Sequence, residues 1–157
     1  MSEYYVTNRD VIKNFAFNTG TSAVPVFTNM CTASELTLKT DFNEKTWFVY
    51  CDAIQRALKT GVALTIDGTI KLDINNLAIQ KVLGDLKSLI KTGAISQFNN
   101  QLVQFELLTG VSTSVLTYTK LQATVSYSLE SLGGAAEDEA SFSISMTING
   151  TGTEVSA

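Results

Sequence analysis

The feature that most constrains the fold is a two-residue alternation of apolar and polar side chains over residues 112–149. The apolar positions are first Leu121, Ala123, Val125, Tyr127 and Leu129, and then Phe142, Ile144, Met146 and Ile148. Because successive side chains of a strand point to opposite faces, this pattern predicts two long strands, each with one apolar and one hydroxyl-rich face. A small-residue and acidic turn over residues 133–139 separates them. Such a sheet surface contains no reaction centre, so it favours assembly over catalysis.

Length and composition limit the classes of protein to which this chain can belong. A chain of 157 residues, 45% of them apolar, predicts one folded domain over residues 1–157. Its 11 basic and 15 acidic residues give a formal charge of −4, and no window concentrates the basic ones, which argues against a nucleic-acid binder. Residues 1–5 lack the basic start and apolar core of a signal peptide, and no apolar run is long enough to cross a bilayer. We therefore expect cytoplasmic synthesis and no membrane partner.

The order of elements predicts a mainly β fold with one helix. Residues 1–30 are expected to form an arm or long loop, and residues 33–152 a β core that includes the helix. The helix is expected at about residues 76–91, where Asn76 offers a cap and Gly93 a stop. Its predicted apolar stripe consists of Ile79, Val82, Leu83, Leu86, Leu89 and Ile90. Asp85 is expected on the opposite face, and Gly84 at a close contact with the sheet.

The middle of the chain predicts three short elements. Residues 46–51 are expected to form a strand buried on both faces, and residues 52–60 a short helix that ends at Gly61. Residues 62–74 are expected to form a hairpin around Asp67 and Gly68, in a register that opposes Leu64 to Ile70. Two cysteines without a CxxC pair, Cys31 and Cys51, are expected to be buried thiols.

The search for chemistry finds no reaction centre in the sequence. The absence of histidine excludes histidine-dependent triads and most imidazole metal sites. The sequence has no phosphate-binding glycine loop, and two distant cysteines cannot make a structural zinc site. We therefore expect no catalytic, cofactor-binding or metal-binding residues and no cofactor.

Two groups of side chains allow more than one interpretation. Glu137, Asp138 and Glu139 form either a solvated turn, an acidic patch with a role in assembly, or, least favoured, a metal site. The aromatic side chains of Trp47, Tyr118 and Tyr127 could stack on nucleic-acid bases in principle. Packing in a core or an interface is favoured because basic neighbours are scarce.

The C-terminal segment carries a resemblance to a known family. Residues 137–152 run from the acidic turn through a serine–apolar alternation to Gly150 and Gly152. This order resembles the closing strand of bacteriophage tail tube (major tail) proteins. The order of a hairpin at 62–74 followed by a helix that ends near Gly93 is also similar, and the resemblance covers about residues 33–152. It implies a β-sandwich or barrel of antiparallel strands flanked by one helix.

The resemblance also implies a function. Six copies would close into a ring, and stacked rings would form a tube that encloses the tape measure protein and conducts genomic DNA in transit. Further partners would be tail terminator and baseplate or tip proteins, in a virion tail that assembles in the host cytoplasm. A non-contractile tail is favoured over a contractile one. The alternatives are an inner tube of a contractile tail or type VI-like injection system, a monomeric β-sandwich binding module for a sugar or peptide, and, least favoured, an enzyme.

Two candidate assembly sites follow from this reading. An arm that bridges rings would use Tyr4, Tyr5, Val11, Ile12, Phe15 and Phe17. The acidic patch would either line the lumen or pair with basic residues of a neighbour, such as Lys39, Lys45 or Lys71.

Overall fold

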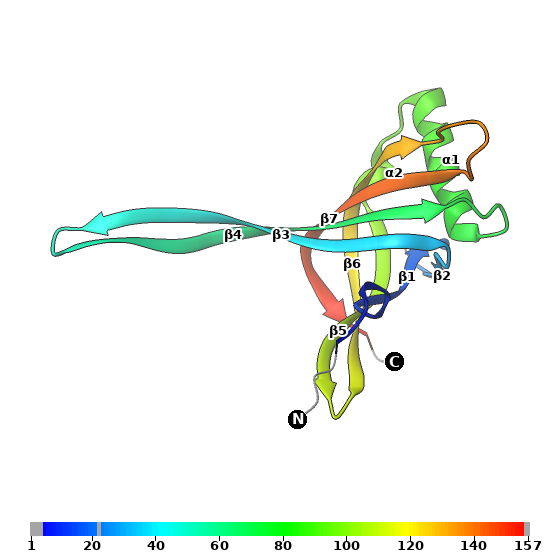
Figure 1. Cartoon of the computed structure of the whole chain (residues 1–157). Helices are drawn as coiled ribbons and strands as arrows, with labels where there is room; N and C mark the ends of the chain where they lie inside the picture. The colour runs from blue at the N-terminus through cyan, green and yellow to red at the C-terminus, as the bar shows by residue number, and fades with distance from the viewer. Residues whose placement is uncertain (1–4, 22, 156–157) are drawn as a thin grey trace.

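A computed structural model describes residues 5–21 and 23–155 and confirms the mainly β fold. Within these residues, seven antiparallel strands form one continuous sheet in the order β2-β1-β5-β6-β7-β4-β3, in place of two stacked sheets (Figure 1). The strands are β1 Ile12–Asn18, β2 Phe27–Asn29, β3 Ala33–Val49, β4 Asp52–Lys71, β5 Gln101–Ser112, β6 Val115–Leu132 and β7 Ser141–Glu154. The helical elements are η1 Asn8–Asp10, α1 Leu77–Thr92 and α2 Ser96–Asn99.

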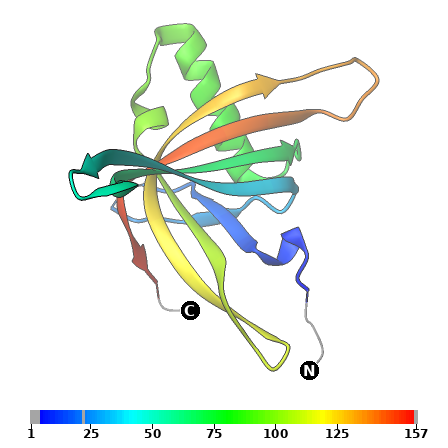
Figure 2. The same ribbon diagram turned by 60° about the vertical axis from the view of Figure 1, so that its left-hand side comes forward.

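The sheet curls around a single apolar core, with α1 along one side (Figure 2). Strands β6 and β7 pair as the alternation predicts, with Tyr127 opposite Met146 and Val125 opposite Ile148. Strands towards both ends of the sheet contribute to the same core, because Phe15 of β1 is buried in it and Leu36 of β3 packs against it. The hydroxyl side chains of β6 and β7 lie on the other face of the sheet. The predicted two-faced strands are therefore confirmed.

Helix α1 begins and ends where the sequence indicates. The side chain of Asn76 accepts hydrogen bonds from the backbone N–H groups of Ala78 and Ile79, and Gly93 ends the helix in the left-handed conformation at φ 72°. Val82 and Ile79 are fully buried against the sheet.

Three expectations about the faces of α1 are wrong. Ile90 is 77% exposed, because the C-terminal turn of the helix extends past the core. A Cβ atom at Gly84 would meet no atom within 4 Å, so this glycine marks no close contact among the described residues. Asp85 is buried, because the hydroxyl group of Tyr127 gives its carboxylate a partner inside the core.

The N-terminal region is part of the core, and the expected arm over residues 1–30 is wrong for this part. Strand β1 lies between β2 and β5, and its side chains Ile12, Phe15 and Phe17 are buried. Aromatic contacts explain this placement, since the ring centroids of Phe17 and Tyr127 lie 5.5 Å apart. Val11 packs at the edge of the core and Tyr5 is 81% exposed, whereas Tyr4 lies outside the described residues.

The middle of the chain forms one long hairpin. The strand expected at residues 46–51 is present as far as Val49 but is exposed, and the other two expectations are wrong. Strands β3 and β4 pair almost without interruption from Ala33–Ile70 to Val49–Asp52, with the turn at Tyr50 and Cys51. Residues 52–60 are therefore strand, not helix. Asp67 and Gly68 lie within β4 opposite Thr37 and Leu36, not in a turn. Both Cys31 and Cys51 are exposed, and the run 46–51 is exposed as well.

Candidate assembly surfaces

The far end of the β3–β4 hairpin projects from the rest of the molecule (Figure 1). Strand β7 pairs with β4 only from Thr65 to Lys71, so the preceding residues of β4 are paired with β3 alone. We call residues 42–62 the arm, and the remaining described residues the body. The arm is a two-stranded ribbon, and each of its strands has one free edge among the described residues.

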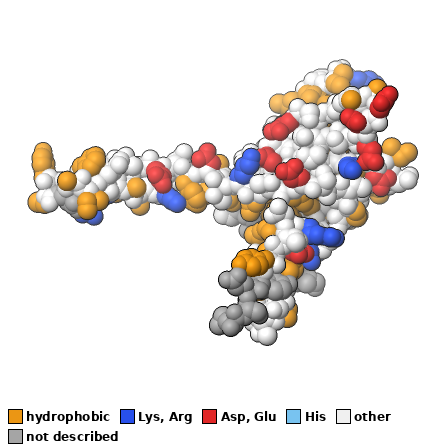
Figure 3. Space-filling model, in the orientation of Figure 1, with side chains coloured by type: hydrophobic (Ala, Val, Ile, Leu, Met, Phe, Trp, Pro, Cys, Tyr) orange, Lys and Arg blue, Asp and Glu red, His pale blue; other side chains and the backbone are white. Residues whose placement is uncertain are grey.

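The arm exposes large apolar side chains along its length (Figure 3). They are Phe42, Trp47, Phe48, Val49, Tyr50, Ile54, Leu58 and Val62, with exposed fractions from 38% upward. The apolar side chains lie on both faces of the ribbon: Trp47 and Leu58 project from one face, and Phe48 projects from the other. Both faces of the ribbon therefore offer a surface to another molecule.

Isolated two-stranded ribbons are marginally stable in water, and contiguous exposed apolar surface marks interaction sites. Free strand edges also present unpaired backbone groups to other chains. These properties make the arm the strongest candidate for an assembly surface in the described chain.

An ion pair lies in the body, close to the base of the arm. The Nζ atom of Lys39 on β3 lies 2.7 Å from Oδ2 of Asp67 on β4. The hydrogen bond from Lys39, followed by one from Ser145 on β7, lowers the pKa of Asp67, and the same pair with Asp67 raises the pKa of Lys39. Asp67 therefore connects β3, β4 and β7 close to the point where the arm leaves the sheet.

The acidic turn between β6 and β7 is exposed, as the solvated-turn reading expects. Glu139 lies 2.9 Å from Nζ of Lys71 in the same chain, and this hydrogen bond lowers the pKa of Glu139. Two of the three lysines suggested as partners in a neighbouring subunit, Lys39 and Lys71, thus pair within their own chain. Lys45 is exposed on the arm. The described residues contain no group of three His, Cys, Asp or Glu side chains that could hold a metal ion.

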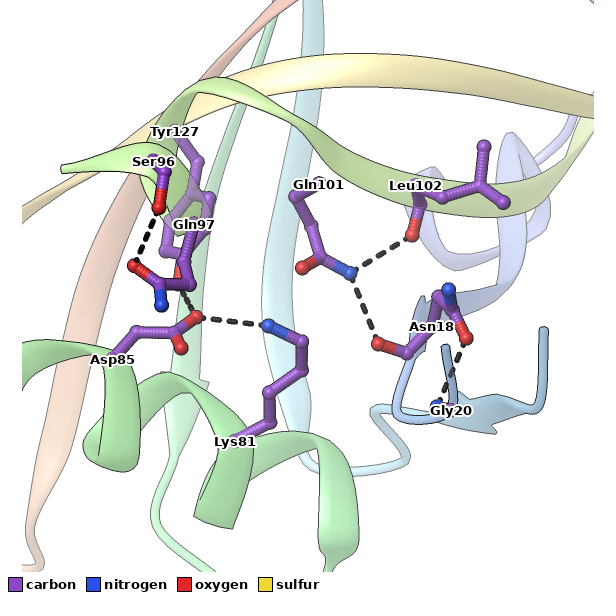
Figure 4. A network of polar contacts seen from close by, with 9 residues as sticks. All are labelled: Asn18, Gly20, Lys81, Asp85, Ser96, Gln97, Gln101, Leu102 and Tyr127. Atoms are coloured by element: carbon purple, nitrogen blue, oxygen red, sulfur yellow. Dashed lines mark hydrogen bonds and ion pairs between the residues drawn. The ribbon is translucent and has the colours of Figure 1, made fainter. Parts of the chain in front are cut away.

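A buried polar network, which the sequence analysis missed, connects α1 to the sheet (Figure 4). The hydroxyl group of Tyr127 donates to Oδ2 of Asp85 at 2.5 Å, and Nζ of Lys81 lies 2.9 Å from the same oxygen. Burial and then the Asp85 carboxylate raise the pKa of Tyr127, so the hydroxyl stays protonated and acts as the donor. The four-residue spacing of Lys81 and Asp85 was the available signal.

The network has a structural role. It borders the aromatic cluster, where the ring centroids of Phe98 and Tyr127 lie 4.8 Å apart. Nearby, the side-chain amide of Gln101 donates to the backbone oxygen of Asn18 and so connects β5 to β1 (Figure 4). Of these contacts, the hydrogen bond between Tyr127 and Asp85 joins α1 to the sheet. No described helix has the length and apolar character that a membrane crossing requires.

Comparisons with known proteins rest on structure alone, because no protein-family model and no curated protein matches the sequence. A chain from the tail of an empty gene transfer agent particle with C6 symmetry superposes with a TM-score of 0.57 at 9% identity, covering 92% of this chain and 97% of that one. A chain of the SPP1 tail tube gives 0.55 at 18% identity, with coverages of 92% and 76%. The chain has the fold of tail tube proteins.

A chain from the six-fold symmetrised baseplate of the anti-feeding prophage superposes with a TM-score of 0.52 at 12% identity, covering 99% of this chain and 97% of that one. This match covers almost the whole chain and therefore includes both the body and the arm. The resemblance inferred from residues 33–152 is confirmed at the level of the fold.

Proposed function

We propose that this protein is the structural subunit of a tail tube and assembles with copies of itself into stacked hexameric rings. The observation that carries the proposal is the arm, which exposes apolar side chains on both faces within a chain of the tail tube fold. Burying this surface in a neighbouring copy removes it from water, at about 25 cal/mol for each Å² of apolar area. The role is structural and requires no cofactor.

In this proposal the tube encloses the tape measure protein before ejection and conducts the genomic DNA afterwards. Tail terminator and baseplate or tip proteins close its two ends, and the tube belongs to a virion tail that assembles in the host cytoplasm. The hydroxyl-rich sheet face and the net charge of −4 support transient passage of DNA, because neither offers cations to hold phosphates.

A second candidate is the inner tube of a contractile injection system, which the likeness to the anti-feeding prophage baseplate chain supports. The two candidates share the tube and differ in the sheath that surrounds it. A sheath gene beside the gene for this chain, and co-purification of its product with the tube, would favour the contractile system. A monomeric binding module is disfavoured, because it would leave the arm exposed to water.

The test is assembly of the purified full-length chain, measured by negative-stain microscopy and light scattering. Rings or tubes are expected from the natural sequence, because the exposed arm needs a partner surface. A Trp47→Ser, Phe48→Ser, Tyr50→Ser variant should remain a folded monomer at concentrations where the natural chain, of 17.0 kDa per copy, assembles.

The matched control is Ile90→Ser, which removes a 77% exposed side chain from α1 and should leave assembly unchanged. A natural chain that stays monomeric at every concentration, or tubes that form equally well without the three aromatic side chains, would contradict the proposal.

A further inference from the structure

An open seam separates η1 and β1, near one end of the curled sheet, from β3 at the other end. Two adjoining cavities of about 610 and 670 Å³ lie between η1–β1 on one side and β3 on the other. Both cavities are lined by apolar side chains, among them Ile12 and Leu36, and by polar and charged side chains, among them Arg9. We call this groove the seam. Its volume is in the range of pockets that hold several side chains of a ligand.

Strand edges border the seam on both sides. Strand β3 is the last strand of the sheet, so among the described strands residues 33–38 pair with β4 alone. Strand β2 pairs with β1 only from Ala16 to Asn18, so residues 12–14 have no described strand on that side. An extended segment entering the seam could therefore bond to backbone groups at its walls, as in β-augmentation.

The tip of the arm offers the groove an uncharged segment with exposed aromatic side chains. Residues 46–51 carry no charge, so they can enter the groove without burying an unpaired ion of their own. Phe48 and Tyr50 are 64% and fully exposed, respectively, and Trp47 adds a third aromatic ring. At about 150–250 Å² for a buried aromatic side chain, the tip offers on the order of 500 Å². Counting both partners, the contact reaches roughly 1,000 Å², which a specific interface requires.

The arm cannot reach the seam of its own chain. Cys31 lines the seam just before β3, and Cys51 lies in the turn just after β3. A strand of this length extends roughly 50 Å at about 3.3 Å per residue, which separates the two thiols within one molecule. The arm itself reaches roughly 30 Å beyond the body by the same measure, about the scale of a compact domain of this size.

We propose that the seam of one copy receives the arm tip of a second copy, with Trp47, Phe48 and Tyr50 entering the groove between β1 and β3. This inference rests on the proposed function and specifies the acceptor surface. It places Cys51 of one copy near Cys31 of the next, although a single chain holds them far apart.

Disulfide cross-linking of the assembled protein tests this placement, with diamide as the oxidant. The natural chain should give a ladder of covalent dimers, trimers and larger species on a non-reducing gel, because each copy contributes one thiol at its tip and one at its seam. Cys31→Ser and Cys51→Ser should each assemble normally and give no species larger than a dimer. Peptide mass spectrometry should identify the Cys31–Cys51 linkage.

Three further variants keep the test decisive. Cys31→Ser, Ser34→Cys moves the thiol along the seam and should restore the ladder, whereas Cys31→Ser, Lys87→Cys places it on exposed α1 and should not. Ser34→Trp fills the seam and should raise the critical concentration for assembly at least tenfold, with an unchanged melting temperature.

Assembly of the natural chain distinguishes a wrong acceptor surface from a wrong proposed function. The seam is not the acceptor if tubes form normally, give no ladder with a thiol at either seam position, and form equally well with Ser34→Trp. That outcome would leave the proposed function standing. A natural chain that never assembles would overturn the proposed function and this inference with it.

Discussion

In its body half, strand β4 buries Ile66 and Ile70 completely, whereas in its arm half Ile54 and Leu58 are 72% and 57% exposed. Both halves belong to one strand and pair with the same partner, β3. The difference is that the body half pairs with β7 and packs into the core. The arm half has neither a third strand nor a core beside it in the described chain. The apolar side chains of β4 therefore form the core in the body, whereas in the arm they remain largely exposed and available to a partner.

The largest effect on subunit stability should come from truncating the body half of β4. Ile66→Ala should lower the free energy of unfolding of the dispersed subunit by about 2–5 kcal/mol, through lost burial and a cavity. The matched change in the arm, Ile54→Ala, should cost less than about 0.5 kcal/mol, because that side chain is already in contact with water. Urea denaturation measures both values, and equal losses would show that the arm is buried in the dispersed subunit.

A smaller effect is expected from acidic residues in the two regions. Asp85→Ala in the body should cost about 1–3 kcal/mol, because the buried hydroxyl of Tyr127 loses its acceptor. Glu44→Ala on the exposed arm should change stability by less than about 0.5 kcal/mol. Asp85→Asn keeps an acceptor oxygen and should fall between them. If Asp85→Ala unfolds at the same urea concentration as the natural chain, the network does not fix α1.

The smallest effect should come from the Lys39–Asp67 pair at the base of the arm. Because the folded pKa of Asp67 is lowered, its contribution is present above the unfolded value of about 3.9 and is lost as the pH falls through the folded value. The raised pKa of Lys39 confers a contribution that is lost only at strongly basic pH. Lys39→Met should therefore reduce the loss of thermal stability between pH 5 and 2, measured as melting temperature. An unchanged acid profile would show that the pair adds nothing.

Part of the body was predictable from sequence, because burial imposes a two-residue period on its long strands. The alternation around Val125 and Ile144 locates β6 and β7, and a cap and a glycine stop locate α1. The buried Asp85 was missed because a charged residue at a helix face normally indicates solvent, and only its hydrogen-bond partner, 42 positions away, explains its burial.

The arm was not predictable by the same rules. Its turn at Tyr50 and Cys51 carries none of the glycine or asparagine signals of tight hairpins, whereas Asp67 and Gly68 carry such a signal inside a strand. Because both faces of the arm are exposed, no burial enforces a two-residue period, and the spacing of Ala53, Ile54, Ala57 and Leu58 resembled a helix. In the body, β1 was mistaken for a loop because it is short and carries Asn14 at φ 52° within a bulge.

The arm and the seam are different surfaces of one subunit, and this has a consequence for how growth can stop. Contacts between unlike surfaces are heterologous: each added subunit satisfies one surface and presents another, until a rotation closes the series. A subunit with a shortened arm would still accept a neighbour and would offer nothing onward. Mixed with natural subunits, it should act as a chain terminator at substoichiometric amounts, so the arm would make assembly sensitive to a minority of defective copies.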